Sequence, residues 1–263
     1  MNRAGVRKPA VAGVFYPADE SELRRMVRAY IQDAVYEGGR PRALIGPHAG
    51  YEYSGPVAGS AYKSLRDQRE VIHRVLLLGP SHHVPMIGLG GSSAEAFETP
   101  FGLVPVDMES MDSLLEFQQV RIMDNAHEYE HSIETHLPFL QEMLDEFSVI
   151  PVLTGDATTE EVTEVIEKFI ENTDTLIAVS SDLSHYFDYD TARRFDEAAS
   201  RAIEQLNPEA LHPEHACGIV PIQGLLLASE NHGLSANTLD LRSSGDTAGP
   251  RDTVVGYGAF VFT

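Results

Sequence analysis

The run Val75-Leu76-Leu77-Leu78-Gly79, followed directly by Pro80-Ser81-His82-His83, shows the pattern that decides the fold. Four consecutive apolar residues bounded by turn-forming residues are typical of a short strand buried on both faces, as in a parallel sheet. Residues that follow such a strand lie at its carboxyl end, where open α/β sheets bind their ligands. His82 is therefore a candidate metal ligand or acid-base residue at that edge of the sheet.

Three further predicted strands end in a turn that carries a histidine or an acidic residue. The segments are ALIG at 43–46 before His48, LIAVSS at 176–181 before Asp182 and His185, and LDLRSSG at 239–245 before Asp246. Because the carboxyl ends of parallel strands meet at one edge of a sheet, we expect these side chains and His82 to converge on one site. A single histidine in such a place is more often a hydrogen-bonded turn residue. Several in equivalent places favour a functional site.

Short apolar runs alternate with longer amphipathic stretches, and this rhythm predicts an α/β fold: a layered sandwich with a central mixed β-sheet flanked by helices. The expected strands are Ala43–Ile45, Val75–Leu78, Val149–Leu153, Leu176–Val179, Ser235–Leu241 and Val254–Phe262. The expected helices are Ser21–Ala34, Val57–Leu65, Ser110–Phe117, His131–Phe147, Thr159–Ile170, Thr191–Leu206 and Ile219–Asn231. Thr99–Val106 is expected to form a hairpin or loop excursion. No repeat or linker divides residues 1–263, which predicts a single domain.

The composition is strongly acidic. The 263 residues carry 40 Asp and Glu against 19 Lys and Arg, a formal charge of −21, and only Lys8, Lys63 and Lys168 are lysines. Such a field disfavours binding to nucleic acid or to anionic membranes, and it is typical of a halophilic archaeon with a salt-rich cytoplasm. One cysteine, Cys217, excludes an intramolecular disulfide, and no stretch has the form of a signal peptide or membrane span. A cytoplasmic location is expected.

Two histidines and one carboxylate would make a recognisable metal site. His48, His82 and Asp246 on one face of an ion, with other positions open, form the arrangement that suits non-haem Fe(II) and its oxygen chemistry. Zinc with a bound water accepts the same ligands. His185 would then be free to act as general acid or base, because the ordinary pKa of histidine lies near working pH.

A second cluster, Glu130-His131-Ser132-Ile133-Glu134, precedes an apolar stripe. On a helix, His131 and Glu134 would share a face and could line the pocket or support a ligand, although a solvated acidic helix start explains them equally well. The literal H-E-x-x-H at 127–131 is discounted as a zinc-protease motif because no helical stripe precedes it. Cys217, before Gly218 and an apolar helix, is interpreted as a small buried core residue. The alternative is a nucleophilic thiol, which would require a helix N-terminus to lower its pKa, and the sequence permits that.

Taken together, these motifs resemble the MEMO family, whose fold is related to the class III extradiol ring-cleaving dioxygenases. The similarity runs through nearly the whole chain. The segments that carry it are AGVFYPAD, IGPHAGYEYSG, LLLGPSHHVP, EHSIETHLPFL, IPVLTG, VSSDLSHY, SSGD and VVGYGAF.

The resemblance implies metal positions at His48 of PHAGY and at His82 of GPSHH. The third ligand is cysteine in animal members, and its place falls on Asp246 here, which makes the site more like the two-histidine, one-glutamate centre of the ring-cleaving enzymes. His185 matches a histidine of the same pocket that is similar to the acid-base histidine of those enzymes. Other residues expected in the pocket or behind it are His83, His131, Glu134, Tyr51 and Asp182.

The cofactor implied is Fe(II), with zinc or copper as alternatives. The resemblance also implies AMMECR1-like and radical-SAM proteins as partners of prokaryotic members, beside an unknown small-molecule substrate. Our first hypothesis is a dioxygenase-like oxidoreductase with His185 as the proton-transfer group; the ring-cleaving step rests on fold analogy alone. The alternatives are a non-catalytic module that binds a peptide or partner in the same pocket, and a zinc-dependent hydrolase.

Overall fold

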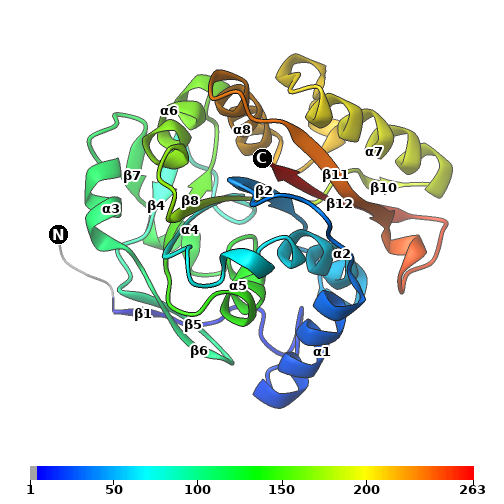
Figure 1. The fold of residues 1–263 in the computed structure, drawn as a ribbon, viewed down its shortest axis with the longest axis horizontal. Helices are drawn as coiled ribbons and strands as arrows, with labels where there is room; N and C mark the ends of the chain where they lie inside the picture. The colour runs from blue at the N-terminus through cyan, green and yellow to red at the C-terminus, as the bar shows by residue number, and fades with distance from the viewer. Residues whose placement is uncertain (1–4) are drawn as a thin grey trace.

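The computed structural model describes residues 5–263, and its centre is a nine-stranded mixed sheet in the order β10-β12-β2-β9-β3-β8-β4-β7, with β11 paired to the outer side of β12 (Figure 1). The strands are β2 (Ala43–Gly46), β3 (Arg74–Pro80), β4 (Leu89–Gly91), β7 (Val120–Ile122), β8 (Ser148–Thr154), β9 (Thr175–Ser180), β10 (His185–Phe187), β11 (Ala236–Ser243) and β12 (Val254–Phe262). A smaller sheet in the order β1-β5-β6 is formed by β1 (Val6–Arg7), β5 (Ala96–Thr99) and β6 (Gly102–Pro105).

The middle of the large sheet is parallel. Strand β9 lies between β2 and β3, and β3 continues the parallel pairing to β8. Their residues are almost all fully buried, which explains why they appear in the sequence as continuous apolar runs rather than as alternating ones. Strands β2, β9 and β3 therefore end side by side on one edge of the sheet.

Helices cover both faces of the sheet, with α1, α2 and α5 on one side and α6, α7 and α8 on the other (Figure 1). The α-helices are α1 (Glu20–Asp33), α2 (Tyr51–Lys63), α3 (Met108–Leu114), α4 (Asp124–His127), α5 (Leu137–Met143), α6 (Thr159–Ile170), α7 (Tyr189–Glu204) and α8 (Ile219–Asn231). Short 3₁₀ turns are η1 (Arg66–Gln68), η2 (Glu134–His136), η3 (Pro208–Ala210), η4 (Pro213–His215) and η5 (Ser244–Asp246).

The predicted fold class is confirmed: this is a mixed α/β structure with a multi-stranded sheet between helices. For some elements, local sequence signals predict the boundaries as the structure has them. Helix α6 begins where Thr158 and Glu161 form a reciprocal capping box, with Glu161 N–H donating to Thr158 Oγ1 at 3.2 Å and Thr158 N–H donating to Glu161 Oε2 at 2.9 Å. The predicted hairpin within Thr99–Val106 is the connection between β5 and β6.

Two helices differ most from the prediction, and packing explains one of them. Helix α2 begins six residues before the expected Val57 and retains Pro56, although proline usually interrupts a helix. Its Gly59 lies so close to α1 that a Cβ there would come within 2.5 Å of the Tyr30 carbonyl oxygen. The close packing of the two helices thus overrides local propensity. The predicted helix His131–Phe147 is regular only from Leu137 to Met143, and its first residues form an irregular turn.

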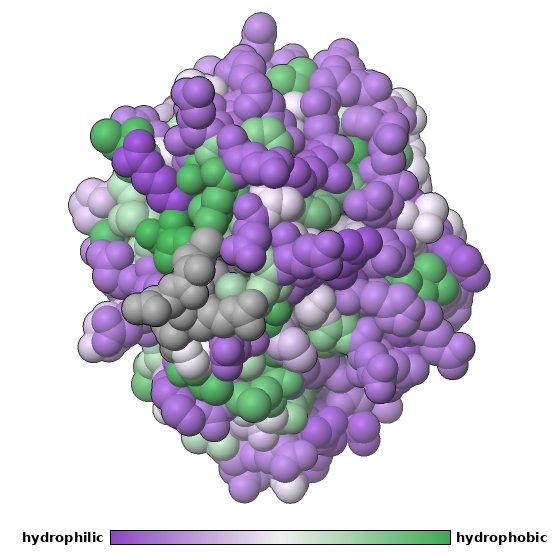
Figure 2. All heavy atoms as spheres, turned by 90° about the vertical axis from the view of Figure 1, so that its left-hand side faces the viewer, coloured by the Kyte–Doolittle hydropathy of each residue, from purple (hydrophilic) through white to green (hydrophobic). Residues whose placement is uncertain are grey.

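The face seen in Figure 2 is covered mostly by hydrophilic residues, with hydrophobic residues gathered in smaller groups between them. Across residues 5–263, none of the helices combines the length and the apolar character needed to cross a membrane.

Candidate metal centre

Three adjacent parallel strands deliver the first residues of the site. His48 follows β2, Asp182 follows β9 and His82 follows β3, each within two residues of the end of its strand. These three residues therefore lie together at the carboxyl ends of parallel strands, which is where open α/β sheets bind their ligands.

A third histidine, His131, completes the cluster from the turn before η2. One nitrogen from each of His48, His82 and His131 lies within 4.8 Å of the other two. The ring centroids of His82 and His131 are 4.7 Å apart and nearly stacked, while the ring of His48 stands edge-on to both at 5.1 and 5.4 Å. Three imidazoles this close could hold a metal ion.

Hydrogen bonds set which nitrogen of His48 is free. Its Nδ1 lies 2.6 Å from Ser180 Oγ, and that hydroxyl donates its own hydrogen to the Ser132 carbonyl oxygen at 2.6 Å. The hydroxyl must therefore accept from Nδ1–H, which leaves the Nε2 lone pair of His48 unprotonated. This is how outer partners orient histidine ligands in metal sites.

Glu130 determines in the same way which nitrogen of His82 is free. Its carboxylate accepts from His82 Nδ1–H at 2.9 Å and from the backbone N–H groups of His82, His131 and Ser132 at 2.6, 2.9 and 2.9 Å. Burial raises the pKa of this carboxyl, but the hydrogen bonds and charge attraction of His82 outweigh burial and hold the pKa at about 2. An ionised Glu130 thus directs the Nε2 of His82 away from itself and fixes the turn that carries His131.

Two of the three imidazoles, His48 and His131, are held in the neutral form that a metal requires. Burial lowers the pKa of His48 well below its usual value, and the neighbouring histidines lower it further. Burial also lowers the pKa of His131 to about 4, against the opposing attraction of Glu130. At neutral pH these side chains therefore offer lone pairs rather than protons. The donor set fits a divalent transition metal.

The cluster lies in a cavity of about 650 Å³. Apolar rings and polar groups share its wall: Phe15, Tyr186, Phe187, Val255, Asp182, His185, Glu214 and Cys217 line it together with the three histidines. Phe15 packs edge-on against His131, with ring centroids 4.8 Å apart. The cavity has the size of a small-molecule site.

His185 and Asp182 face this cavity, as the sequence predicted. His185 Nδ1 lies 2.7 Å from the Leu183 carbonyl oxygen and must donate to it, so the Nε2 of His185 is free to exchange a proton. Asp182 Oδ1 accepts from the backbone N–H groups of His48 and Ala49 at 2.8 and 3.3 Å, and its Oδ2 lies 3.9 Å from His48 Nε2. Asp182 therefore positions the loop that carries His48. Burial raises the pKa of the Asp182 carboxyl.

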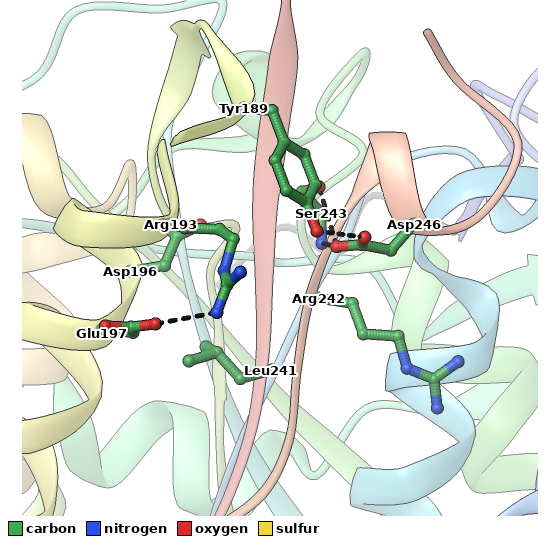
Figure 3. Close-up of a pocket in the computed structure, with 8 residues that line it drawn as sticks. All are labelled: Tyr189, Arg193, Asp196, Glu197, Leu241, Arg242, Ser243 and Asp246. Atoms are coloured by element: carbon green, nitrogen blue, oxygen red, sulfur yellow. Dashed lines mark hydrogen bonds and ion pairs between the residues drawn. The ribbon is translucent and has the colours of Figure 1, made fainter. Parts of the chain in front are cut away.

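Asp246 is not brought to the three histidines. Its carboxylate accepts from Ser243 N–H at 2.9 Å, from Ser243 Oγ at 3.0 Å and from Tyr189 Oη at 2.6 Å, and it pairs with Arg251 at 3.3 Å. It lines a separate pocket of about 350 Å³ together with Tyr189, Arg193 and Arg242 (Figure 3). The reason is topological: β12 lies between β11 and β2, and the η5 turn folds the carboxylate back onto Ser243.

Three other predicted pocket residues lie outside the cavity wall. Glu134 is fully buried and accepts from Arg7, from Tyr16 Oη at 2.5 Å and from the backbone N–H groups of Ala10 and Val11 at 2.7 and 3.0 Å. Tyr51 is a core residue whose hydroxyl donates to the Thr135 carbonyl oxygen at 2.5 Å. His83 is exposed, with its ring 6.0 Å from that of His131. The helical face expected for His131 and Glu134 does not form, because His131 precedes the first helical turn.

The sequence predicts a small buried core residue at Cys217, but the structure places this residue at the site. Its Sγ lies 3.3 Å from His48 Nε2, and the residue is part of the cavity wall. Burial raises the pKa of the thiol to about 12, so in the absence of a metal the S–H group donates to the His48 lone pair. The only signal in the sequence for a role of Cys217 at the site is its position just before the helix that begins at Ile219.

The pocket of Figure 3 contains a buried acid, Asp196, which yields a pH prediction. Burial raises its pKa to about 6, although its Oδ1 accepts from Ser184 N–H at 3.0 Å. Because this pKa is higher in the folded chain than in the unfolded one, the stabilising contribution is complete below about pH 4 and is lost as the pH rises through about 6. The Asp196→Asn variant should therefore gain about 2–3 kcal/mol of unfolding free energy over wild type between pH 4 and pH 7.

Urea unfolding of both proteins at several pH values measures this difference. Asp190→Asn, an exposed change on the same helix, is the matched control and should show no such gain. A constant difference between Asp196→Asn and wild type across this pH range would contradict the prediction.

The comparisons with known proteins agree with the motifs. The family model described as Memo-like protein matches residues 7–261. Relatives described as MEMO1 family proteins include one from Aquifex aeolicus, 36% identical with 98% of this chain and 99% of the relative covered, and one from Nitrosopumilus maritimus, 32% identical over the same shares. A third, from Ignicoccus hospitalis, is 36% identical with 98% of both chains covered.

A solved structure of an uncharacterized protein from Escherichia coli K12 has a TM-score of 0.54 at 13% identity, covering 83% of this chain and 98% of that one. At this identity the likeness concerns the fold alone, whereas the family model and the relatives reach across nearly the whole sequence. The chain belongs to the Memo-like protein family.

Proposed function

We propose that this protein is a metal-dependent oxidoreductase of the non-haem iron class, with His48, His82 and His131 as the residues that hold the ion. Imidazole nitrogen suits iron as well as zinc and copper, and each of these rings has a structural reason to be neutral or correctly oriented. Fe(II) in such a site supplies the redox chemistry by which enzymes use molecular oxygen.

The observation that carries the proposal is the placement of His185. His185 lines the cavity that also holds the three histidines, and its Nδ1 is bound to the Leu183 carbonyl oxygen, so an acid-base group and a metal-ligand cluster address the same bound molecule. Phe15 and Phe187 provide apolar walls for a planar substrate, and His185 would accept or return the proton of its hydroxyl group. Catechols, with their adjacent hydroxyls, are the substrate class that the first hypothesis implies.

Oxygen uptake tests the proposal. Protein purified without air and loaded with Fe(II) should consume oxygen when given a panel of simple catechols, carboxylated catechols and catechol amines. His185→Gln should keep its iron and lose about 100-fold or more in turnover, since general acid-base catalysis contributes roughly 10²–10⁴-fold. Oxygen uptake no faster than that of the iron-free protein with every catechol would refute the assignment.

Zinc-dependent hydrolysis is the second candidate, and one feature favours it. All three clustered side chains are histidines, and because histidine binds a metal as a neutral imidazole, they would leave the charge of a zinc ion undiminished and so favour ionisation of a bound water. Zinc-loaded protein would then hydrolyse an activated ester such as p-nitrophenyl acetate without oxygen. The AMMECR1-like and radical-SAM partners stay a prediction.

A further inference from the structure

We infer that the substrate of this site carries a positively charged group, which Glu214 and the ring of Tyr186 receive at the mouth of the cavity. This inference rests on the catechol-binding cavity of the proposed function and narrows its substrate class to aromatic diols that bear an ammonium group. The diol end of such a molecule would face the three clustered histidines, and its charged end would face solvent.

The wall of the cavity is acidic and has no cationic side chain to balance it. Across residues 5–263, no lysine or arginine lines this cavity, whereas Asp182 and Glu214 both do. The Asp182 carboxylate is already engaged, because it accepts from the backbone N–H groups of His48 and Ala49. Glu214 is exposed and pairs with no lysine or arginine of the described chain. It is therefore the carboxylate that a bound molecule can reach.

A series of aromatic contacts holds Glu214 at the rim. It lies in the 3₁₀ turn η4, whose next residue, His215, is buried and accepts from His212 N–H at 2.9 Å through Nδ1. The ring of His215 packs edge-on against Phe195 at 5.7 Å, and Phe195 stacks on Phe187 at 4.8 Å. Because Phe187 also lines the cavity, the turn that carries Glu214 is packed onto the cavity wall.

Tyr186 brings an aromatic ring to the same rim. The pairing of β10 with β12 is irregular between His185 and Phe187, so Tyr186 bulges out of the ladder. Its φ of 63° lies in the left-handed region, which a residue with a bulky side chain rarely adopts and which is concentrated at ligand-binding sites. The side chain lines the cavity although it is 76% exposed, and its ring stands edge-on to His185 at 5.7 Å. The backbone thus holds a large aromatic ring at the entrance, beside the acid-base residue.

A carboxylate and an aromatic ring together recognise an ammonium group. The face of the ring attracts a cation through its quadrupole, and the carboxylate accepts a charge-assisted hydrogen bond. A neutral chain on the substrate would leave Glu214 without a partner, and an anionic chain would be repelled by it. The rim therefore discriminates among catechols that the histidine cluster alone would treat alike, because the diol is common to all of them.

Three catechols of matched size test the inference: one bears an aminoethyl chain, one an ethyl chain and one a carboxyethyl chain. Calorimetric titration of the zinc-loaded protein without oxygen measures each affinity, because zinc supports no oxidation. Wild type should bind aminoethylcatechol about fivefold or more tightly than ethylcatechol, since an exposed ion pair and a cation–π contact each contribute up to about fivefold. Carboxyethylcatechol should bind most weakly, and added salt should narrow these differences.

Glu214→Gln should lower the affinity for aminoethylcatechol by about two- to fivefold, raise that for carboxyethylcatechol and leave that for ethylcatechol unchanged. Tyr186→Leu should weaken binding of the amine by a similar factor, whereas Tyr186→Phe keeps the ring and should not. Glu209→Gln is the matched control for the general attraction of cations to a chain with a formal charge of −21. Glu209 is exposed on the preceding 3₁₀ turn and does not line the cavity, so its loss should leave all three affinities within about twofold.

Equal affinities of wild type for the three catechols would overturn the inference without touching the oxygen uptake expected of the proposed function. A loss of amine affinity that is the same in Glu214→Gln and Glu209→Gln would overturn it as well. Binding of none of the three would overturn both the inference and the catechol substrate class. If a variant does not fold, the order of the wild-type affinities decides the matter alone.

Discussion

Replacing His131 by alanine should reduce metal affinity by more than the roughly 10–100-fold that an outer contact is worth, whereas replacing Asp246 by alanine should leave it unchanged. His131 contributes one of the three clustered nitrogens, and its turn is held by the ionised Glu130 carboxylate. Asp246 accepts from Ser243 and Tyr189 in the other pocket. Equilibrium dialysis against Co(II), with the bound metal counted by mass spectrometry, measures both affinities.

His83→Ala is the matched control for this comparison. His83 is an exposed histidine beside His82, and it does not line the cavity, so its loss should leave the affinity as it is in wild type. The opposite pattern, with metal lost from Asp246→Ala and retained by His131→Ala, would show that the carboxylate predicted from the sequence is the ligand after all.

The central sheet and two of the three clustered histidines can be predicted from the sequence, because both depend on strong local signals. Buried parallel strands are continuous apolar runs, and the residues that follow them share one edge whatever the order of the strands. Thus His48 and His82 could be placed together without knowing that β9 lies between their strands. His185 follows from the same rule, since it comes soon after β9.

The remaining parts of the site depend on contacts between distant segments. His131 lies in an irregular turn, and the Glu130 carboxylate holds this turn by accepting from His131 N–H and from His82, 48 residues earlier. Asp246 follows a strand on the correct edge of the sheet, but its own Ser243 captures the carboxylate. Cys217 precedes a helix, and no periodicity predicts that this helix begins beside His48.

Glu134 shows the same limit of local reasoning, and its replacement by alanine should lower the unfolding free energy by about 3–5 kcal/mol. The sequence permitted a place near the metal, but the buried carboxylate instead accepts from Arg7, Tyr16 and the backbone of residues 10 and 11. Alanine would leave the Arg7 guanidinium buried without its counter-charge and two amides without an acceptor. Against a typical stability of about 5–15 kcal/mol this is a large loss.

Urea unfolding gives the free energy, and Glu128→Ala, an exposed glutamate in the segment just before, is the control expected to stay within about 0.5 kcal/mol of wild type. The Glu134→Ala substitution should affect the metal site only by lowering the stability of the fold. Arg7 also donates to the carbonyl oxygens of His127 at 3.0 Å and Glu130 at 2.5 Å, so Glu134 anchors the N-terminal segment to the turn that carries His131. We therefore expect folded Glu134→Ala to bind Co(II) within about tenfold of wild type, less than an outer contact of a ligand can cost. A loss of metal without a loss of stability would place Glu134 among the residues that act on the ion itself.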